Sequence, residues 1–176
     1  MSIRNFDGRS PKIHSSAFVD DLALVLGDVT IGEDSSIWPM TVARGDVHRI
    51  VIGARTNIQD GSVLHVTADN HFHPGGFPLI IGDDVTVGHG AILHACTIES
   101  MTLIGMGATV LDGAIVRRGA LVAAGSLVPP GKDLEGGFIW KGNPVQKGRA
   151  LSVTETEYLA FSALHYVALK DRHRVQ

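Results

Sequence analysis

Aliphatic residues recur every six positions along most of this chain, with polar and small residues between them. A small residue (Ala, Ser or Thr) follows most of these positions by four places, and Gly often follows directly. The register is interrupted twice and shifts once by a single residue. The aliphatic positions are Val25, Ile31, Ile37, Ile52, Ile58, Leu64, Ile81, Val87, Leu93, Ile98, Ile104, Val110, Val116, Val122 and Val128.

A six-residue repeat of this kind predicts a parallel β-helix, in which each repeat supplies one short strand and a turn. Three repeats then make one triangular coil of about 18 residues. The aliphatic residue points into the prism, the small residue lets the chain turn the corner, and coils stack at roughly 4.7–4.9 Å. No three-and-four spacing of apolar residues favours a helix in this region. We therefore predict an all-β prism over residues 1–130.

Residues 131–176 follow a different pattern. The repeat is expected to stop at the turn 129–131, where two prolines precede a glycine. Two capping-box patterns, at 152–155 and 154–157, predict the start of a helix. Apolar residues near helical spacing then predict an amphipathic helix over 158–170. We expect a turn-rich connection and a C-terminal α-helix that packs along the prism in the same domain.

Composition agrees with this fold and narrows the function classes. The chain has 21 Gly and only 6% aromatic residues, which suits short strands and tight turns. A net charge of −3 with scattered Lys and Arg gives no basis for a nucleic-acid or membrane partner. The single cysteine, Cys96, rules out an internal disulfide. The first residues lack an apolar signal region and no run is long enough to span a bilayer, so we expect a cytoplasmic protein.

Three histidines lie on the repeats, and the register predicts how they are arranged. His65 and His94 each directly follow an interior leucine, whereas His89 lies two places after an interior valine. If residues 66–79 loop out in place of one corner, His65 and His94 stack on the same face in adjacent coils. His89 then lies on the preceding face, where it does not easily reach the same ion within one subunit.

A closed homotrimer would bring these three side chains together, because it packs one face of a prism against a different face of its neighbour. Three neutral imidazoles leave one tetrahedral position open, which is typical of a catalytic zinc. Such a zinc lowers the pKa of bound water to about 7. We therefore predict Zn²⁺ at each subunit interface, with Fe²⁺ or Co²⁺ as alternatives because imidazole also suits these ions.

The other histidines and the cysteine have simpler interpretations. His71 and His73 lie in the irregular loop and are either proton shuttles, gating residues or plain surface residues. Cys96 is interpreted as a small core residue rather than a soft metal ligand. The histidines interpreted as surface residues are His14, His48, His165 and His173.

Several short motifs resemble those of the γ-class carbonic anhydrases, and the YrdA/PaaY/CaiE-like bacterial branch is the most similar in appearance. They are Arg44-Gly45-Asp46, the stretch 57–65, Gly88-His89, the stretch 93–97 and the turn 125–132. The resemblance covers nearly the whole chain. It implies a left-handed β-helix, against the usual right-handed crossover, and a homotrimer with interface metal held by His65, His89 and His94.

The resemblance also implies roles for the residues around the metal. Gln59 would orient the attacking hydroxide through a hydrogen bond, and Asn57 would help to position carbon dioxide or bicarbonate. Arg44 would pair across the subunit interface with the carboxylate of Asp46 or Asp60. Such a charge pair sets the register of an interface more than it adds stability.

One departure from the family pattern concerns proton transfer. Well-studied archaeal members have a glutamate directly after the Arg-x-Asp motif, where this chain has Val47. They also have an acidic loop after the first histidine, whereas the loop here contains Asp69, His71 and His73. A histidine with a pKa near neutral is suited to proton transfer, so His71 and His73 are candidate shuttles. The carboxylate of Asp69 is the third candidate. The resemblance implies an enzyme that reversibly hydrates carbon dioxide to bicarbonate with a metal-bound hydroxide, and the loss of both shuttle carboxylates predicts that its activity is low.

Other functions share this fold and are not separated by it. The same metal site would support hydrolysis of acyl-CoA thioesters. Hexapeptide acyltransferases use a histidine base without a metal, and three clustered histidines argue against that activity. The last alternative is a structural subunit with a vestigial metal.

Overall fold

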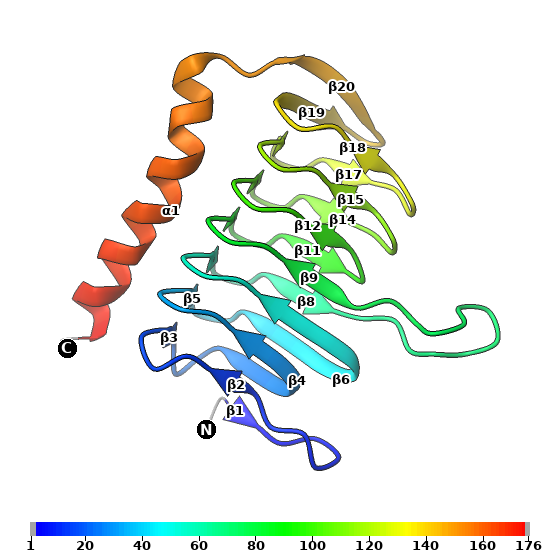
Figure 1. Cartoon of the computed structure of the whole chain (residues 1–176), viewed down its shortest axis with the longest axis vertical. Coiled ribbons are helices and arrows are strands. Elements are labelled where there is room, and N and C mark those ends of the chain that lie inside the picture. The colour runs from blue at the N-terminus through cyan, green and yellow to red at the C-terminus, as the bar shows by residue number, and fades with distance from the viewer. Residues whose placement is uncertain (1–2, 175–176) are drawn as a thin grey trace.

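The computed structural model describes residues 3–174 and shows a triangular prism of stacked coils with one helix beside it (Figure 1). The coils form a left-handed parallel β-helix: the repeat predicts the parallel β-helix, and the family resemblance alone implies its left hand. The three faces arise because each aliphatic repeat position points inward and the chain turns before the next one. Within residues 3–174, no helix has the length and apolar character that crossing a membrane requires.

Two faces are joined along one edge, because the long strands β4 (Leu24–Ile31) and β6 (Val42–Ile52) continue around the corner between them. The first of these, the histidine face, consists of β1 (Ile3–Arg4), the first halves of β4 (Leu24–Ile31) and β6 (Val42–Ile52), β8 (Val63–His65), β11 (Ile92–His94), β14 (Thr109–Val110) and β17 (Leu127–Val128). The second face consists of β2 (Lys12–Ile13), the second halves of β4 and β6, β9 (Leu79–Ile81), β12 (Thr97–Ile98), β15 (Ile115–Val116) and β18 (Asp133–Leu134).

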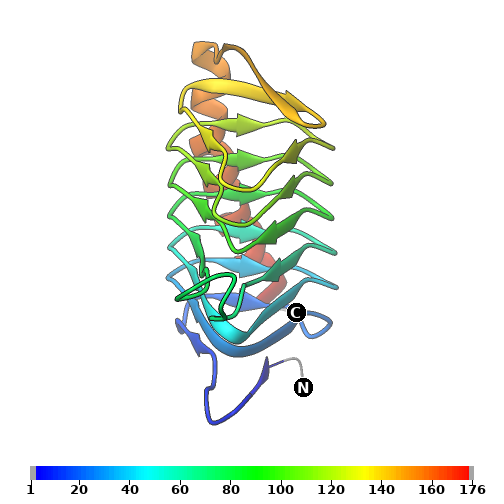
Figure 2. The ribbon, with the colours of Figure 1, turned by 90° about the vertical axis from the view of Figure 1, so that its right-hand side faces the viewer.

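The third face, the helix face, is covered by α1 (Val153–Arg174), which contacts β5 (Ser36–Ile37), β7 (Asn57–Ile58) and β10 (Thr86–Val87). In Figure 2 the helix lies behind the stacked strands. The strands of this face are β3 (Phe18–Val19), β5 (Ser36–Ile37), β7 (Asn57–Ile58), β10 (Thr86–Val87), β13 (Leu103–Ile104), β16 (Leu121–Val122), β19 (Phe138–Gly142) and the antiparallel β20 (Val145–Ala150).

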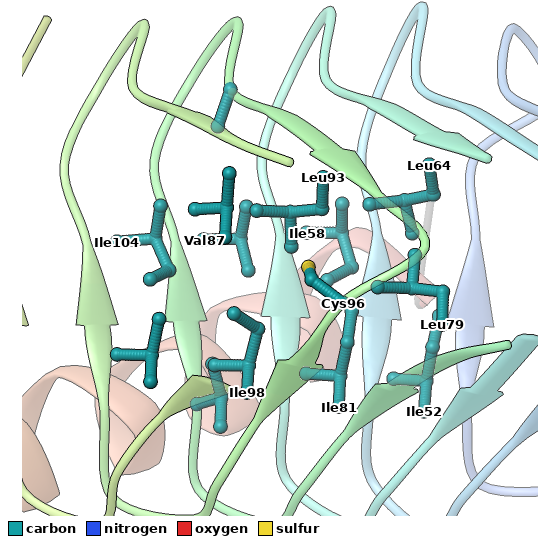
Figure 3. Packing of buried hydrophobic residues seen from close by; sticks show 14 of the residues in the cluster. Ile52, Ile58, Leu64, Leu79, Ile81, Val87, Leu93, Cys96, Ile98 and Ile104 are labelled. Carbon is teal, nitrogen blue, oxygen red and sulfur yellow. The ribbon is translucent and has the colours of Figure 1, made fainter. Parts of the chain in front are cut away.

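The core is the inside of the prism, where the labelled side chains in Figure 3 meet from all three faces. The repeat positions from Val25 to Val128 are at most 1% exposed. Each such side chain contributes roughly 1.5–3 kcal/mol by leaving water. Cys96 lies among them, which confirms its interpretation as a core residue, and burial raises the pKa of its thiol.

The repeat continues beyond the expected stop at 129–131, so this expectation was wrong. Leu134 pairs with Val116 on the second face, and Trp140 pairs with Val122 on the helix face. Both lie at further positions of the six-residue repeat, six and twelve residues after Val128. The turn at 129–131 forms one more corner of the prism. The bulk of Trp140, 6% exposed, fills the end of the prism.

The helix is longer than the predicted span of 158–170. Its start follows the first capping box: the Glu155 N–H donates to Ser152 Oγ at 3.2 Å, and the Ser152 N–H donates to the Glu155 carboxylate at 2.8 Å. The second pattern, at 154–157, is not a cap, because Thr154 lies inside the helix. The last turn is held by Arg174, whose guanidinium donates to the carbonyls of residues 15 and 16.

Candidate metal centre

His65 and His94 lie side by side on the histidine face. Strands β8 and β11 are neighbours, and His65 and His94 are paired in their register, which confirms the stacking that the sequence predicts. Because Leu64 and Leu93 point into the core, the side chains that follow them point outward. His65 Nδ1 and His94 Nε2 are 3.1 Å apart.

A carboxylate fixes the hydrogen of each ring on the nitrogen that faces away from the other histidine. Asp46 Oδ1 is 3.1 Å from His65 Nε2, and Asp112 Oδ1 is 2.6 Å from His94 Nδ1. An ionised carboxylate only accepts hydrogen bonds, so these two ring nitrogens must be the donors. In the neutral rings, His65 Nδ1 and His94 Nε2 therefore hold lone pairs that face each other. A cation between them removes the repulsion.

The charge states around this pair support that assignment. Burial acts to raise the pKa of Asp46 and Asp112, but the hydrogen bonds that each carboxylate accepts lower it by more. Asp46 accepts from Arg44 and His65. Asp112 accepts from Thr67 and His94. The pKa of each carboxyl is therefore below its ordinary value, and both are ionised at neutral pH. Burial lowers the pKa of His65, which favours its neutral form.

The spacing of the two ring nitrogens fits a metal ion. Two nitrogens bonded to one zinc at about 2.0–2.1 Å in a tetrahedral arrangement lie roughly 3.3 Å apart. The 3.1 Å between His65 Nδ1 and His94 Nε2 is close to this value. Metal-bound histidines usually donate their other N–H to a carboxylate, as both rings do here. Within residues 3–174, no group of three or more His, Cys, Asp or Glu side chains is placed to hold a metal ion.

His89 lies in the turn between β10 and β11, at the edge where the helix face meets the histidine face. It is half exposed, and its Nδ1 is 2.8 Å from Asp60 Oδ2. Because the Asp60 carboxylate only accepts hydrogen bonds, the neutral ring of His89 has its hydrogen on Nδ1 and its lone pair on Nε2, directed away from Asp60. All three predicted ligands thus have a carboxylate partner. The structure brings His65 and His94 together and leaves His89 at a different edge, as the register predicts.

The charged residues expected at an interface form pairs within the chain. Arg44 Nη1 donates to Asp46 Oδ2 at 2.5 Å, so Arg44, Asp46 and His65 make one connected group. Asp60 has His89 rather than Arg44 as its partner. The pairing of Arg44 across a subunit interface stays a prediction.

Gln59 and Asn57 lie on the helix face under α1. The Gln59 side-chain amide donates to Asn57 Oδ1 at 3.1 Å, and the Asn57 amide donates to Thr86 Oγ1 at 3.0 Å. Thr86 Oγ1 is 2.9 Å from the hydroxyl of Ser162 on the helix. Gln59 is 6% exposed and Asn57 only 1%. This chain of hydrogen bonds fixes Gln59 in place, with Asn57 behind it.

A cavity of about 350 Å³ lies between α1 and the helix face, and Gln59 and His89 both line it. Gly88 and Gly105 also line it, and a Cβ on Gly105 would be 2.4 Å from the Ala124 nitrogen of the next coil, so glycine is required there for the coils to stack. Most other lining residues are apolar or aromatic. They include Leu103, Ile104, Met106, Leu121, Val122, Ala123, Tyr158 and Tyr166.

The candidate proton shuttles lie in the loop that projects from the prism between β8 and β9 (Figure 1). Asp69 accepts from the backbone N–H of residue 75 at 2.8 Å, and His71 packs on Phe72 with ring centroids 3.6 Å apart. Within residues 3–174, no hydrogen bond or ion pair joins Asp69, His71 or His73 to a predicted ligand. Their role in proton transfer stays a prediction.

Asp112, which contacts His94, is not among the residues predicted from the sequence. The signal was present, because Asp112 follows His94 by 18 residues, which is one full coil of the repeat. Residues one coil apart are neighbours on the same edge, so every carboxylate at that separation from a candidate ligand is a candidate partner. Ser162, which anchors the hydrogen bonds behind Gln59, gives no comparable signal.

No family model matches the chain. Protein YrdA of Escherichia coli K12 is 51% identical over 171 residues, covering 97% of this chain and 93% of YrdA. A probable carbonic anhydrase of Methanocaldococcus jannaschii is 49% identical over 149 residues, covering 85% and 89%. The mitochondrial gamma carbonic anhydrase 1 of Arabidopsis thaliana is 43% identical over 175 residues, covering 99% of this chain and 63% of that protein.

Solved structures agree with the fold. A putative acetyltransferase from Bacillus cereus has a TM-score of 0.92 and 41% identity, covering 99% of this chain and 98% of that one. A hexapeptide transferase family protein from Anaplasma phagocytophilum has a TM-score of 0.89 and 41% identity, covering 96% of both chains. The chain therefore belongs to the γ-class carbonic anhydrase-like family of hexapeptide-repeat proteins, in the branch that includes YrdA.

Proposed function

We propose that this protein is a metal-dependent γ-class carbonic anhydrase that interconverts carbon dioxide and bicarbonate. The observation that supports it most is the 3.1 Å distance between His65 Nδ1 and His94 Nε2, with a carboxylate on the far nitrogen of each ring. Relatives covering most of the chain are named carbonic anhydrases. When bound, a zinc ion would lower the pKa of a coordinated water to about 7 and supply hydroxide at neutral pH.

The site is completed by a neighbouring copy of the chain. His65 and His94 supply two ligands, and His89 of the next copy supplies the third in a closed homotrimer. Exposed apolar residues support this contact. Val63 and Ile92, 39% and 42% exposed, precede the two histidines on the histidine face, whereas Met40 and Met106, 66% and 59% exposed, lie on the edge that holds His89.

Gln59 and Asn57 have different roles in this proposal. Gln59 borders the cavity beside His89, so its amide is the group that hydrogen-bonds the reacting oxygen. Asn57 is 1% exposed and both ends of its amide are engaged within the chain. It therefore holds Gln59 in position and does not itself touch carbon dioxide.

A second candidate function is hydrolysis of acyl thioesters, and the cavity favours it. A volume of about 350 Å³ is typical of sites for drug-sized ligands and far exceeds the need of a three-atom substrate. The apolar lining would receive an acyl chain, while Gln59 and His89 lie at the same cavity.

Stopped-flow hydration of carbon dioxide tests the first proposal. Anaerobically purified protein is loaded with Zn²⁺, Fe²⁺ or Co²⁺ and compared with His94→Ala. We expect hydration by the loaded protein that His94→Ala lacks. Fully loaded protein with no hydration at any buffer concentration would contradict the proposal. A panel of acyl-CoA substrates in the same preparations then decides whether the thioesterase candidate replaces it.

A further inference from the structure

The side chains of Thr67, His94 and Asp112, which come from successive coils, are connected by hydrogen bonds beside His65. Asp112 lies one coil beyond His94, and its Oδ1 is 2.6 Å from His94 Nδ1. Its other oxygen, Oδ2, accepts a hydrogen bond from the hydroxyl of Thr67. The side chains of Asp112 and His94 are 27% and 33% exposed, so water competes for these contacts only in part.

Asp112 determines which nitrogen of His94 is available to a ligand. The hydrogen bond that one ring nitrogen makes decides which of the two holds the proton. Because a carboxylate accepts and does not donate, Asp112 keeps the hydrogen on Nδ1 and leaves the lone pair on Nε2. Nε2 is the atom that faces His65 Nδ1 at 3.1 Å. The opposite tautomer would present an N–H at this point.

Thr67 determines how the carboxylate is held. A carboxylate with one engaged oxygen still rotates about its Cβ–Cγ bond, and the Thr67 hydroxyl engages the second oxygen. Thr67 is itself fixed, because its backbone N–H and C=O pair with those of Phe77 at 3.1 and 3.0 Å. These two bonds close the neck of the loop between β8 and β9. The root of the loop is therefore linked to His94 through one carboxylate.

We propose that Asp112 and Thr67 are positioning residues that fix the tautomer and orientation of His94 for a divalent metal ion. This proposal rests on the proposed function, because it assumes that His94 binds a metal ion. It does not depend on which substrate the protein uses. Removal of such outer partners typically lowers metal affinity 10–100-fold. We expect a loss in this range for Asp112→Ala, a smaller loss for Thr67→Val, and affinity near wild type for Thr67→Ser.

Two measurements test the proposal, one of which needs no metal. Nitrogen-15 NMR of the ring of His94 in metal-free protein at pH 8 reports which nitrogen is protonated. Competition for Zn²⁺ with a chromophoric chelator reports affinity. Both are made on wild type, Asp112→Ala, Thr67→Val and Thr67→Ser. Asp133→Ala, which removes an exposed carboxylate on the second face, is the matched control.

We expect wild-type His94 to be protonated on Nδ1 and Asp112→Ala to shift protonation toward Nε2, with a 10–100-fold loss of Zn²⁺ affinity. Unchanged protonation and affinity in folded Asp112→Ala would overturn the proposal. An equal loss in Thr67→Ser and Thr67→Val would remove the hydroxyl from the account. If wild type binds no Zn²⁺, the proposed function fails, and the NMR result still decides whether Asp112 sets the tautomer.

Discussion

If the metal site is shared between chains, certain pairs of ligand variants should recover metal binding when they assemble into mixed trimers. His65 and His94 come from adjacent strands of one chain, and His89 lies on another edge. A trimer of His65→Ala chains or of His89→Ala chains alone has no complete site. In a mixed trimer, one interface of the three places an intact His65–His94 pair against an intact His89. Random assortment of equal amounts makes about three quarters of the trimers mixed, so about one quarter of the wild-type sites return.

The assay is metal content per chain after the two variants are unfolded, mixed, refolded and isolated as trimers. The matched control mixes His65→Ala with His94→Ala. These ligands must come from the same chain, so no mixed trimer contains a complete site and no metal should return. Equal recovery in both mixtures, or none in verified mixed trimers of the first pair, would refute the division of ligands between chains.

Three further predictions concern assembly, proton transfer and the helix. Arg44→Ala should weaken the trimer while leaving the subunit folded, because Arg44 lies outside the core; a trimer unchanged at low micromolar concentration by sedimentation would contradict this. Val47→Glu should raise hydration at low buffer without changing metal content, because Val47 is 46% exposed beside Asp46, and added imidazole should replace the missing shuttle in wild type. The hydrogen bond from Arg149 and the Ser152 N–H lower the pKa of Glu155 to about 2, so its stabilisation is complete above its ordinary pKa and lost as pH falls toward 2. The Tm difference between wild type and Glu155→Gln, measured by circular dichroism, should therefore be largest above pH 5 and shrink at lower pH; a constant difference would argue against the ion pair.

The repeat predicted the prism and the stacking of His65 on His94, because one interior residue fixes the direction of its two neighbours on a strand. Other features depend on tertiary contacts that no local pattern shows. The helix extends past residue 170 because Arg174 and His173 contact the first coils. Arg174 donates to the Ser16 carbonyl, and the ring centroids of His173 and Trp38 are 5.1 Å apart. The resemblance implies that Asn57 helps to position carbon dioxide or bicarbonate, a role that stays a prediction, and only the packing of α1 shows that its side-chain amide donates to Thr86.

Anomalous diffraction at the metal absorption edge, from crystals of metal-loaded protein, would locate the metal ion and the side chains that bind it. We expect one peak per chain, about 2.0–2.1 Å from His65 Nδ1 and His94 Nε2 and from a nitrogen of His89 in a neighbouring copy. Fully loaded crystals with the peak elsewhere, or with His89 distant from it, would contradict the shared metal site.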